Sequence, residues 1–254
     1  MAIKKLLFID TNIWLDFYRA SAEPGLRLLE HVESISGRLI ASYQLEMEYK
    51  TNRQAVIKAA LGLLKSPPAI ERPGIFSDAK ALAALERNFR DASKRLDVLR
   101  GRLQRAFKNP SACDPVYQAC QRLFHQRSPL VLTRDNECKY TIRRKAMRRF
   151  FHGCPPRKND DSSFGDAFHW EWMLDCAVRE NAELVIVSRD SDFGVQLNGQ
   201  SYVNDHLRHE FSQRVSKKRK LLLYSRLAEA LKHFAVHVTR DEEAEEEAMI
   251  RSAT

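Results

Sequence analysis

The fold of this 254-residue chain is indicated first by residues 5–12, which read Lys5-Leu6-Leu7-Phe8-Ile9-Asp10-Thr11-Asn12. A compact apolar run that ends in Asp-Thr-Asn predicts a buried strand leading into a helix. Similar runs occur at 38–41, 183–187 and 220–224, and helix-like stretches lie between them. Strands that alternate with helices favour a parallel sheet covered on both faces. We therefore expect an α/β fold, a three-layer α/β/α sandwich with a central parallel sheet.

The middle of the chain is too long for a single connection between neighbouring parallel strands. Such a crossover needs only about a dozen residues or more, whereas the second and third runs are separated by residues 42–182. Within this part, residues 78–108 repeat apolar side chains every three or four positions, which predicts a long amphipathic helix. We therefore predict one domain over residues 1–240 that contains a helical insertion at 66–152.

The charge of the chain is unevenly distributed. There are 42 Lys and Arg against 33 Asp and Glu, a formal net charge of +9. Residues 241–254 carry −5, from six acids and Arg251, which leaves +14 on residues 1–240. This balance favours a polyanionic partner, of which nucleic acid is the commonest. The acidic terminal segment itself is predicted to be a disordered, solvated tail.

Cysteine and apolar patterns bear on the cellular location. The five cysteines are odd in number and widely spaced, without a Cys-x-x-Cys pair. This argues against a disulfide framework or a zinc ribbon and favours a reducing, cytoplasmic location. No apolar run approaches the roughly 18 residues of a membrane-spanning helix, so we expect no membrane association.

Acidic residues occur where several elements reach one edge of the predicted sheet. Asp10 follows the first strand, and Asp190 and Asp192 follow the third. Asp166 begins the helix before the third strand, and Glu48 lies early in the helix after the second. Ligands of parallel α/β sheets bind beyond the carboxyl ends of the strands. These five acids are therefore candidates for a common site.

Each acid also has a simpler explanation. Asp10 and Asp166 can cap or stabilise a helix N-terminus, Asp190 can belong to a turn, and Glu48 can be a surface residue with Glu46 as its competitor. Together, however, like charges in one crevice repel and raise one another's pKa unless a cation intervenes. A cluster of oxygen ligands suits Mg²⁺ or Mn²⁺, as one or two ions.

Four stretches resemble the PIN-domain family of metal-dependent nucleases, in particular its prokaryotic PIN-like branch with a helical insertion between the second and third acids. They are Leu6-Leu7-Phe8-Ile9-Asp10-Thr11-Asn12-Ile13-Trp14, residues 43–53 (Tyr43-Gln44 to Asn52-Arg53), Gly165-Asp166-Ala167-Phe168-His169-Trp170 and residues 185–193 (Val185 to Phe193). The order of these motifs is more specific than any one of them. The resemblance covers roughly residues 5–60 and 155–235.

The resemblance implies roles for individual residues. It makes Asp10, Glu48, Asp166 and Asp190 the catalytic and metal-binding acids, with Asp192 as an accessory metal ligand. It favours Glu48 over Glu46, and it leaves open whether Asp190 or Asp192 faces the metal. By the same analogy, Asn12, Asn52, Arg53 and Ser188 would contact phosphate or support the acids. Arg157 and Lys158, in the Pro-rich loop before Asp166, are also expected to contact substrate.

The activity implied by the resemblance is metal-dependent hydrolysis of phosphodiester bonds by an endonuclease. RNA is the commoner substrate of PIN domains, so an endoribonuclease is favoured over a deoxyribonuclease. The same analogy suggests a toxin or defence effector with an inhibitory or regulatory protein partner. Two alternatives remain open: a non-catalytic module that binds RNA or protein, and an assembly subunit that forms a homo-oligomer through the helix at 78–108.

A further basic stretch, Lys139 to Arg149, places six cations on one predicted helix. It is either a track for nucleic-acid phosphates or an ordinary solvated helix face.

Overall fold

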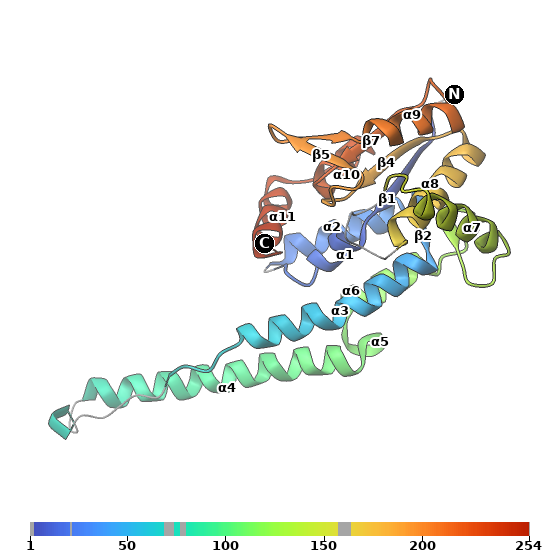
Figure 1. The fold of residues 1–254 in the computed structure, drawn as a ribbon. Coiled ribbons are helices and arrows are strands. Elements are labelled where there is room, and N and C mark those ends of the chain that lie inside the picture. Colours follow the sequence, from blue (N-terminus) through green and yellow to red (C-terminus); the bar gives the residue numbers. More distant parts are fainter. Residues whose placement is uncertain (1–2, 21, 69–73, 77–79, 157–163, 254) are drawn as a thin grey trace. The chain divides into compact units, whose positions relative to one another are not determined.

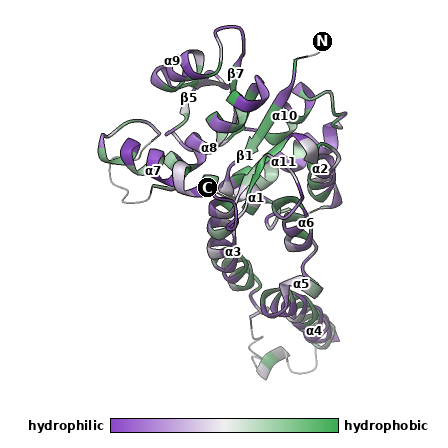
Figure 2. Ribbon diagram, turned by 90° about the vertical axis from the view of Figure 1, so that its right-hand side faces the viewer, coloured by the Kyte–Doolittle hydropathy of each residue, from purple (hydrophilic) through white to green (hydrophobic). Residues whose placement is uncertain are grey.

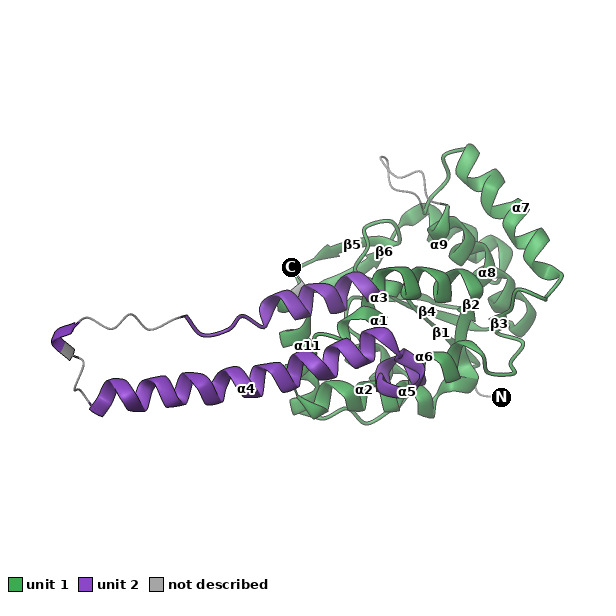
Figure 3. Cartoon of the chain, turned by 90° about the horizontal axis from the view of Figure 1, so that it is seen from below, with its two compact units in different colours: residues 1–52, 119–254 green, residues 53–118 purple. Residues whose placement is uncertain are grey.

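The computed structural model describes residues 3–20, 22–68, 74–76, 80–156 and 164–253. The chain divides into two compact units (Figure 3). Unit 1 consists of residues 1–52 and 119–254, and unit 2 consists of residues 53–118.

A five-stranded sheet forms the core of unit 1, in the order β3-β2-β1-β4-β7, and every neighbouring pair is parallel (Figure 1). Its strands are β1 (Lys5–Ile9), β2 (Leu39–Ser42), β3 (Val131–Leu132), β4 (Glu183–Val187) and β7 (Leu221–Tyr224). The central strand β1 is apolar because both of its faces are covered, and Leu6 to Ile9 are at most 1% exposed. In Figure 2, β1 is accordingly drawn in green, the colour of hydrophobic residues.

Helices flank this sheet, which confirms the predicted α/β sandwich. The helices of unit 1 near the sheet are α1 (Thr11–Asp16), α2 (Glu23–Ser34), α7 (Cys138–Phe151), α8 (Gly165–Glu180), α9 (Asp205–Arg214), α10 (Leu227–His233) and α11 (Arg240–Ala253). A short 3₁₀ turn, η1 (Ser36–Arg38), leads into β2, and β5 (Gly194–Leu197) pairs with β6 (Gln200–Val203) as a separate antiparallel hairpin. Helix α8 packs on the sheet, where the indole N–H of Trp172 donates to the carbonyl of Ala41 at 2.9 Å.

Unit 2 differs in extent from the predicted insertion at 66–152. It contains the second part of α3 (Tyr43–Leu63), a 3₁₀ turn η2 (Gly74–Phe76), the long helix α4 (Lys80–Lys108), α5 (Pro110–Cys113) and the start of α6 (Pro115–Phe124). Residues 119–152 instead belong to unit 1, because β3 pairs with the edge strand β2 and α7 packs on α8. The second compact unit, residues 53–118, therefore has different bounds from the predicted insertion.

The acidic terminal segment, predicted to be disordered, is helix α11 in the structure. Thr239 and Glu242 form a capping box: the backbone N–H of Thr239 donates to Glu242 Oε2 at 2.8 Å, and that of Glu242 donates to Thr239 Oγ1 at 3.3 Å. Gly25 of α2 permits close packing, since a Cβ there would lie 3.0 Å from Cγ of Glu245. Glu246 is 3% exposed and accepts the backbone N–H groups that begin α10. The glutamates of this segment thus contact the fold, whereas Asp241 is exposed.

No helix within the described ranges has the length and hydrophobicity required to cross a bilayer.

Candidate functional site

The candidate site begins where β1 and β4 end side by side. Ile9 pairs with Val187 in the sheet, so Asp10 and Ser188 are the next residues on two adjacent strands. The backbone N–H of Asp10 donates to the carbonyl of Val187 at 2.9 Å. The hydroxyl of Ser188 donates to Oδ2 of Asp10 at 2.5 Å. The strand register therefore brings two segments that are far apart in sequence to one point at the carboxyl edge.

Asp10 caps α1 and also belongs to the acidic cluster. Its Oδ1 accepts the backbone N–H of Thr11 at 2.6 Å, and its Oδ2 accepts Nδ2 of Asn12 at 3.0 Å. The side chain is buried, and this burial raises its pKa above the ordinary value of 3.8, although the hydrogen bond from Ser188 opposes the shift. The charge of Asp190 raises the pKa of Asp10 further. Asp10 is therefore held in a fixed orientation beside other acids.

Glu48 reaches the same region from α3. Its Oε2 accepts hydrogen bonds from His169 Nε2 at 2.9 Å and from the hydroxyl of Thr11 at 3.2 Å, and its Oε1 accepts Nε2 of Gln44 at 2.7 Å. Burial alone would raise the pKa of Glu48, but the positive charge of His169, together with these hydrogen bonds, lowers it to about 2. Glu48 is therefore an ionised carboxylate bound to a histidine.

His169 is the central cation of the site. It is 1% exposed, and its ring lies 5.3 Å from that of Phe8. Burial would lower its pKa, but the charge and hydrogen bond of Glu48, with the charges of Asp166 and Asp10, raise it above 6.5. A protonated His169 partly compensates the negative charge of the surrounding carboxylates.

Asp166 lies in the first turn of α8, three residues before His169. Burial raises the pKa of Asp166, and the charge of His169 opposes this shift. A hydrogen bond to Asp192 and the charges of Asp10 and Asp192 raise the pKa further, to about 8. Two carboxyl groups that share a hydrogen bond in this way cannot both be ionised without cost. Asp10, Asp166 and Asp192 thus form an acidic cluster in which ionising every acid is costly unless a cation is present.

Comparison with known proteins supports one family. A family model for the PIN domain matches residues 7–193. The chain belongs to the PIN domain family. No curated protein and no solved structure shows a significant match. PIN domains are generally metal-dependent nucleases, so membership indicates nuclease-type chemistry on nucleic acids.

The PIN domain brings most of the predicted acids together. Glu48 lies against Thr11 and His169, whereas its competitor Glu46 pairs with Lys50 at 2.6 Å and with His125 at 2.8 Å in a different pocket. Asp190 and Asp192, between which the resemblance does not choose, are both near the cluster. Asp192 is 7% exposed and hydrogen-bonded to Asp166, and Asp190 is half-buried, with its backbone N–H bonded to the hydroxyl of Ser188.

The predicted substrate contacts divide into three groups. Asn12 and Ser188 both donate to Asp10, at the site. Asn52 is exposed on α3. Arg53 is 3% exposed, and its guanidinium donates to Asp114 at 2.6 and 2.9 Å, which does not support a phosphate contact there. Arg157 and Lys158 lie outside the described residues.

Sequence reasoning missed the histidine of this PIN domain. His169 has no neighbouring His or Cys at metal-ligand spacing, and for this reason it was not expected in the site. The available signal was its place three residues after Asp166, because residues i and i+3 share one face of a helix. Gln44 and Thr11, which donate to the Glu48 partner of His169, carry no comparable signal, since their contacts depend on how α3 and α1 meet.

The donor types in this PIN domain fit a hard divalent cation. The cluster offers carboxylate oxygens, the ligands that Mg²⁺ and Mn²⁺ prefer. Oδ1 of Asn12 is a further buried oxygen, and it has no hydrogen-bond partner among the described residues. In the described part of the chain, no three Asp, Glu, His or Cys side chains are arranged as a preformed metal site. The fit therefore rests on the chemistry of the donors and on the cost of ionising these acids together without a cation.

Proposed function

We propose that this PIN-domain protein is an endonuclease that uses Mg²⁺ or Mn²⁺ to hydrolyse phosphodiester bonds, with RNA as its preferred substrate. The observation that carries the proposal is the acidic cluster of Asp10, Asp166 and Asp192, in which burial and mutual repulsion raise the pKa of Asp10 and Asp166. Buried acids that destabilise one another are common at functional sites, where a ligand relieves the repulsion.

The residues of the cluster have distinct roles in this proposal. Asp10, Asp166 and Asp192 would hold one or two ions, with Asp190 beside them. When bound, the ion supplies a water of lowered pKa as nucleophile and neutralises the charge that develops on the leaving oxygen. Ser188 and Asn12 fix the orientation of the Asp10 carboxylate by donating to its Oδ2.

Glu48 and His169 act as a pair in the same proposal. Both oxygens of Glu48 accept hydrogen bonds, from His169, Thr11 and Gln44. Glu48 therefore serves the site mainly by holding His169 in place and in its protonated form. The protonated ring places a positive charge next to Asp166 and Asp10, where the phosphate of a substrate would arrive.

The preference for RNA and the biological setting rest on family analogy. We propose a cytoplasmic enzyme acting as a toxin or defence effector and restrained by a protein partner. The surplus of basic residues supports nucleic acid as the substrate class. It does not distinguish RNA from DNA.

The test is a cleavage assay on single-stranded RNA and DNA of the same sequence, with Mg²⁺ or Mn²⁺ and with EDTA. We expect cleavage of RNA that EDTA abolishes and that Asp10→Asn and Asp166→Asn remove. Asp175→Asn is a matched control, because Asp175 lies on the same helix but pairs with Arg179 instead of the cluster. Cleavage that survives EDTA or both site variants would contradict the mechanism. Preferential cleavage of DNA would contradict the proposed substrate, and RNA binding without cleavage would favour a binding module.

A further inference from the structure

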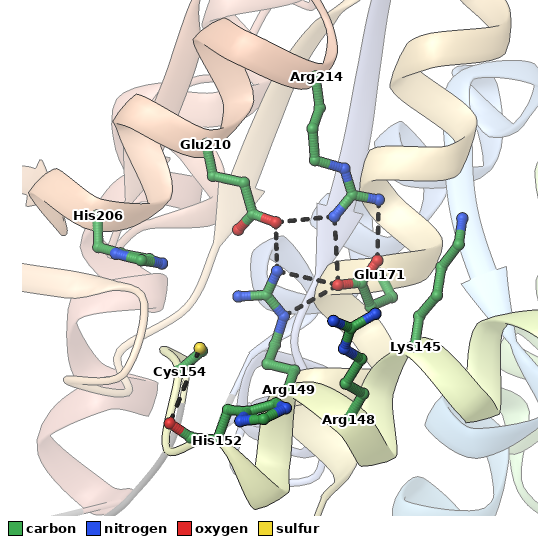
Figure 4. A pocket seen from close by; sticks show the side chains of 9 residues that line it. All are labelled: Lys145, Arg148, Arg149, His152, Cys154, Glu171, His206, Glu210 and Arg214. Carbon is green, nitrogen blue, oxygen red and sulfur yellow. Dashed lines mark hydrogen bonds and ion pairs between the residues drawn. The ribbon is translucent and has the colours of Figure 1, made fainter.

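A basic pocket lies between α7, α8 and α9, and no residue of the acidic cluster lines it (Figure 4). Its volume is about 640 Å³, which is within the usual range of about 300–1,000 Å³ for ligand sites. All of its lining residues belong to unit 1, and none of them belongs to the proposed catalytic set. The pocket therefore needs an explanation of its own.

The floor of the pocket is an ion network of two arginines and two glutamates, drawn with dashed lines in Figure 4. Arg149 donates Nε to Glu171 at 3.0 Å and also pairs with Glu210. Arg214 donates to Glu171 at 2.9 Å and to Glu210 at 2.7 Å. Arg149 and Glu171 are 8% and 4% exposed, so the network is built into the fold.

These contacts use all four carboxylate oxygens of the floor. Oε1 of Glu171 accepts from both arginines, and its Oε2 accepts from Arg214. Oε1 of Glu210 accepts from both arginines, and its Oε2 accepts the indole N–H of Trp170 at 2.9 Å. Burial would raise the pKa of Glu210, but the hydrogen bonds from Trp170 and the arginines lower it. Every carboxylate oxygen of the two glutamates thus accepts at least one hydrogen bond from within the floor or from Trp170.

The rim of the pocket adds cations that the floor does not neutralise. Lys145, Arg148 and His152 follow one another along α7 at spacings of three and four residues, and His206 approaches from α9 (Figure 4). All four are exposed. Within the described ranges, no carboxylate forms an ion pair with Lys145 or Arg148. Lysine and arginine contribute four positive charges to the pocket against two negative ones, before any protonation of the histidines.

We propose that this pocket binds backbone phosphates of the single-stranded nucleic acid on which the protein acts, as an accessory contact outside the acidic cluster. The inference rests on the proposed function for the identity of the strand. Arginine and lysine at the rim can contact phosphate oxygens, and the rigid floor holds the rim helices in place. The alternative interpretation, that Lys139–Arg149 is an ordinary solvated helix face, accounts for the exposed cations. It does not account for a pocket above a saturated ion network.

The distance between the two sites is compatible with one strand. Asp166 and Glu171 lie on the same helix, five residues apart, which corresponds to about 7.5 Å along the axis. At 3.6 residues per turn, positions five apart lie about 140° apart around the helix axis, so a strand that touches both would pass around the N-terminal part of α8. The pocket would then increase affinity without taking part in the chemistry.

The test compares Lys145→Ala/Arg148→Ala with Lys217→Ala/Lys218→Ala, a control that removes the same charge from exposed residues outside the pocket. Binding of a fluorescein-labelled single-stranded RNA is measured by anisotropy in EDTA at several salt concentrations. Each phosphate contact on a single strand contributes about 0.7 to the slope of log affinity against log salt, so the pocket variant should lose about 1.4 in slope and about 25-fold in affinity at 0.1 M salt. The control should lose much less.

The binding assay is independent of cleavage, so failure of the proposed function and failure of this inference are distinguishable. Unchanged affinity and slope in the pocket variant would overturn the inference, as would an equal loss in the control. Polyglutamate is the second probe. If the pocket variant loses affinity for polyglutamate as strongly as for RNA, the pocket belongs to an acidic protein partner and the inference is wrong.

Discussion

Asp166→Asn should abolish cleavage and at the same time stabilise the metal-free protein. The ordinary pKa of an aspartate is 3.8, and in this structure burial and the neighbouring acids raise that of Asp166 to about 8. The folded protein therefore binds the proton of Asp166 more tightly than the unfolded chain does. Asparagine has the same shape, can donate to Asp192 and carries no charge, so it removes this cost of ionisation.

The size and the pH dependence of this stabilisation follow from the shift in the pKa of Asp166. Between pH 3.8 and 8 the unfolded chain has lost the proton while the folded protein keeps it, so the free energy of unfolding falls as the pH rises through this window. At about 1.4 kcal/mol per pKa unit, a shift of roughly four units sets a ceiling of about 6 kcal/mol above pH 8. Asp166 shares its titration with Asp192 and Asp10, so we expect the variant to gain about half of this, ~3 kcal/mol.

The measurement is denaturant unfolding in EDTA, followed by circular dichroism at pH 5 and pH 8.5. Asp166→Asn should be more stable than the wild type at pH 8.5, its advantage at pH 5 should be about a third as large, and Asp175→Asn should show no such pH dependence. Adding Mg²⁺ should stabilise the wild type more than Asp166→Asn, because a ligand that binds only the folded state stabilises it. A variant that is less stable than the wild type at pH 8.5, or equally stabilised at both pH values, would refute the reasoning.

Three further predictions concern other parts of the molecule. His169→Ala should abolish cleavage and lower the free energy of unfolding by about 3 kcal/mol, because it leaves the partly buried carboxylate of Glu48 without its cation; denaturant unfolding and the cleavage assay check this. Thr239→Ala should cost about 1 kcal/mol, measured by unfolding, because it removes the cap of α11; no loss of stability would indicate that this helix does not contribute to the fold. Arg53→Ala should make unit 2 sensitive to limited proteolysis, since the buried carboxylate of Asp114 would lose its positively charged partner; a protease-resistant variant would contradict this.

Several elements of this PIN domain could be predicted because they depend on short stretches of sequence. The strands at 5–9 and 183–187 are continuous apolar runs, and such runs are buried wherever a parallel sheet forms. Asp10 directly follows the first of them, so its place at the carboxyl edge follows from the fold class alone. The positions of Asp10, Glu48 and Asp166 near that edge were expected for the same reason.

Other features depend on contacts between distant parts of the chain. The strand β3 has only two residues and gives no pattern by itself, yet its pairing with β2 moves the boundary of the second unit. The acidic segment at 241–254 has the composition of a solvated tail. It is ordered because Arg226, Lys232 and His31 lie where its acids can pair with them.

The sequence by itself therefore determined the class of the fold and the places of the main strands along the chain, and it predicted which acids lie at the edge of the sheet, since these depend on local patterns and on the geometry common to parallel sheets. Only the tertiary structure decided that His169 pairs with Glu48, that Arg53 pairs with Asp114 inside unit 2 and that Lys145 and Arg148 border a pocket. The physical reason is that the charge state and the partners of a side chain depend on burial and on neighbours from other elements, and residue spacing along the chain does not specify either.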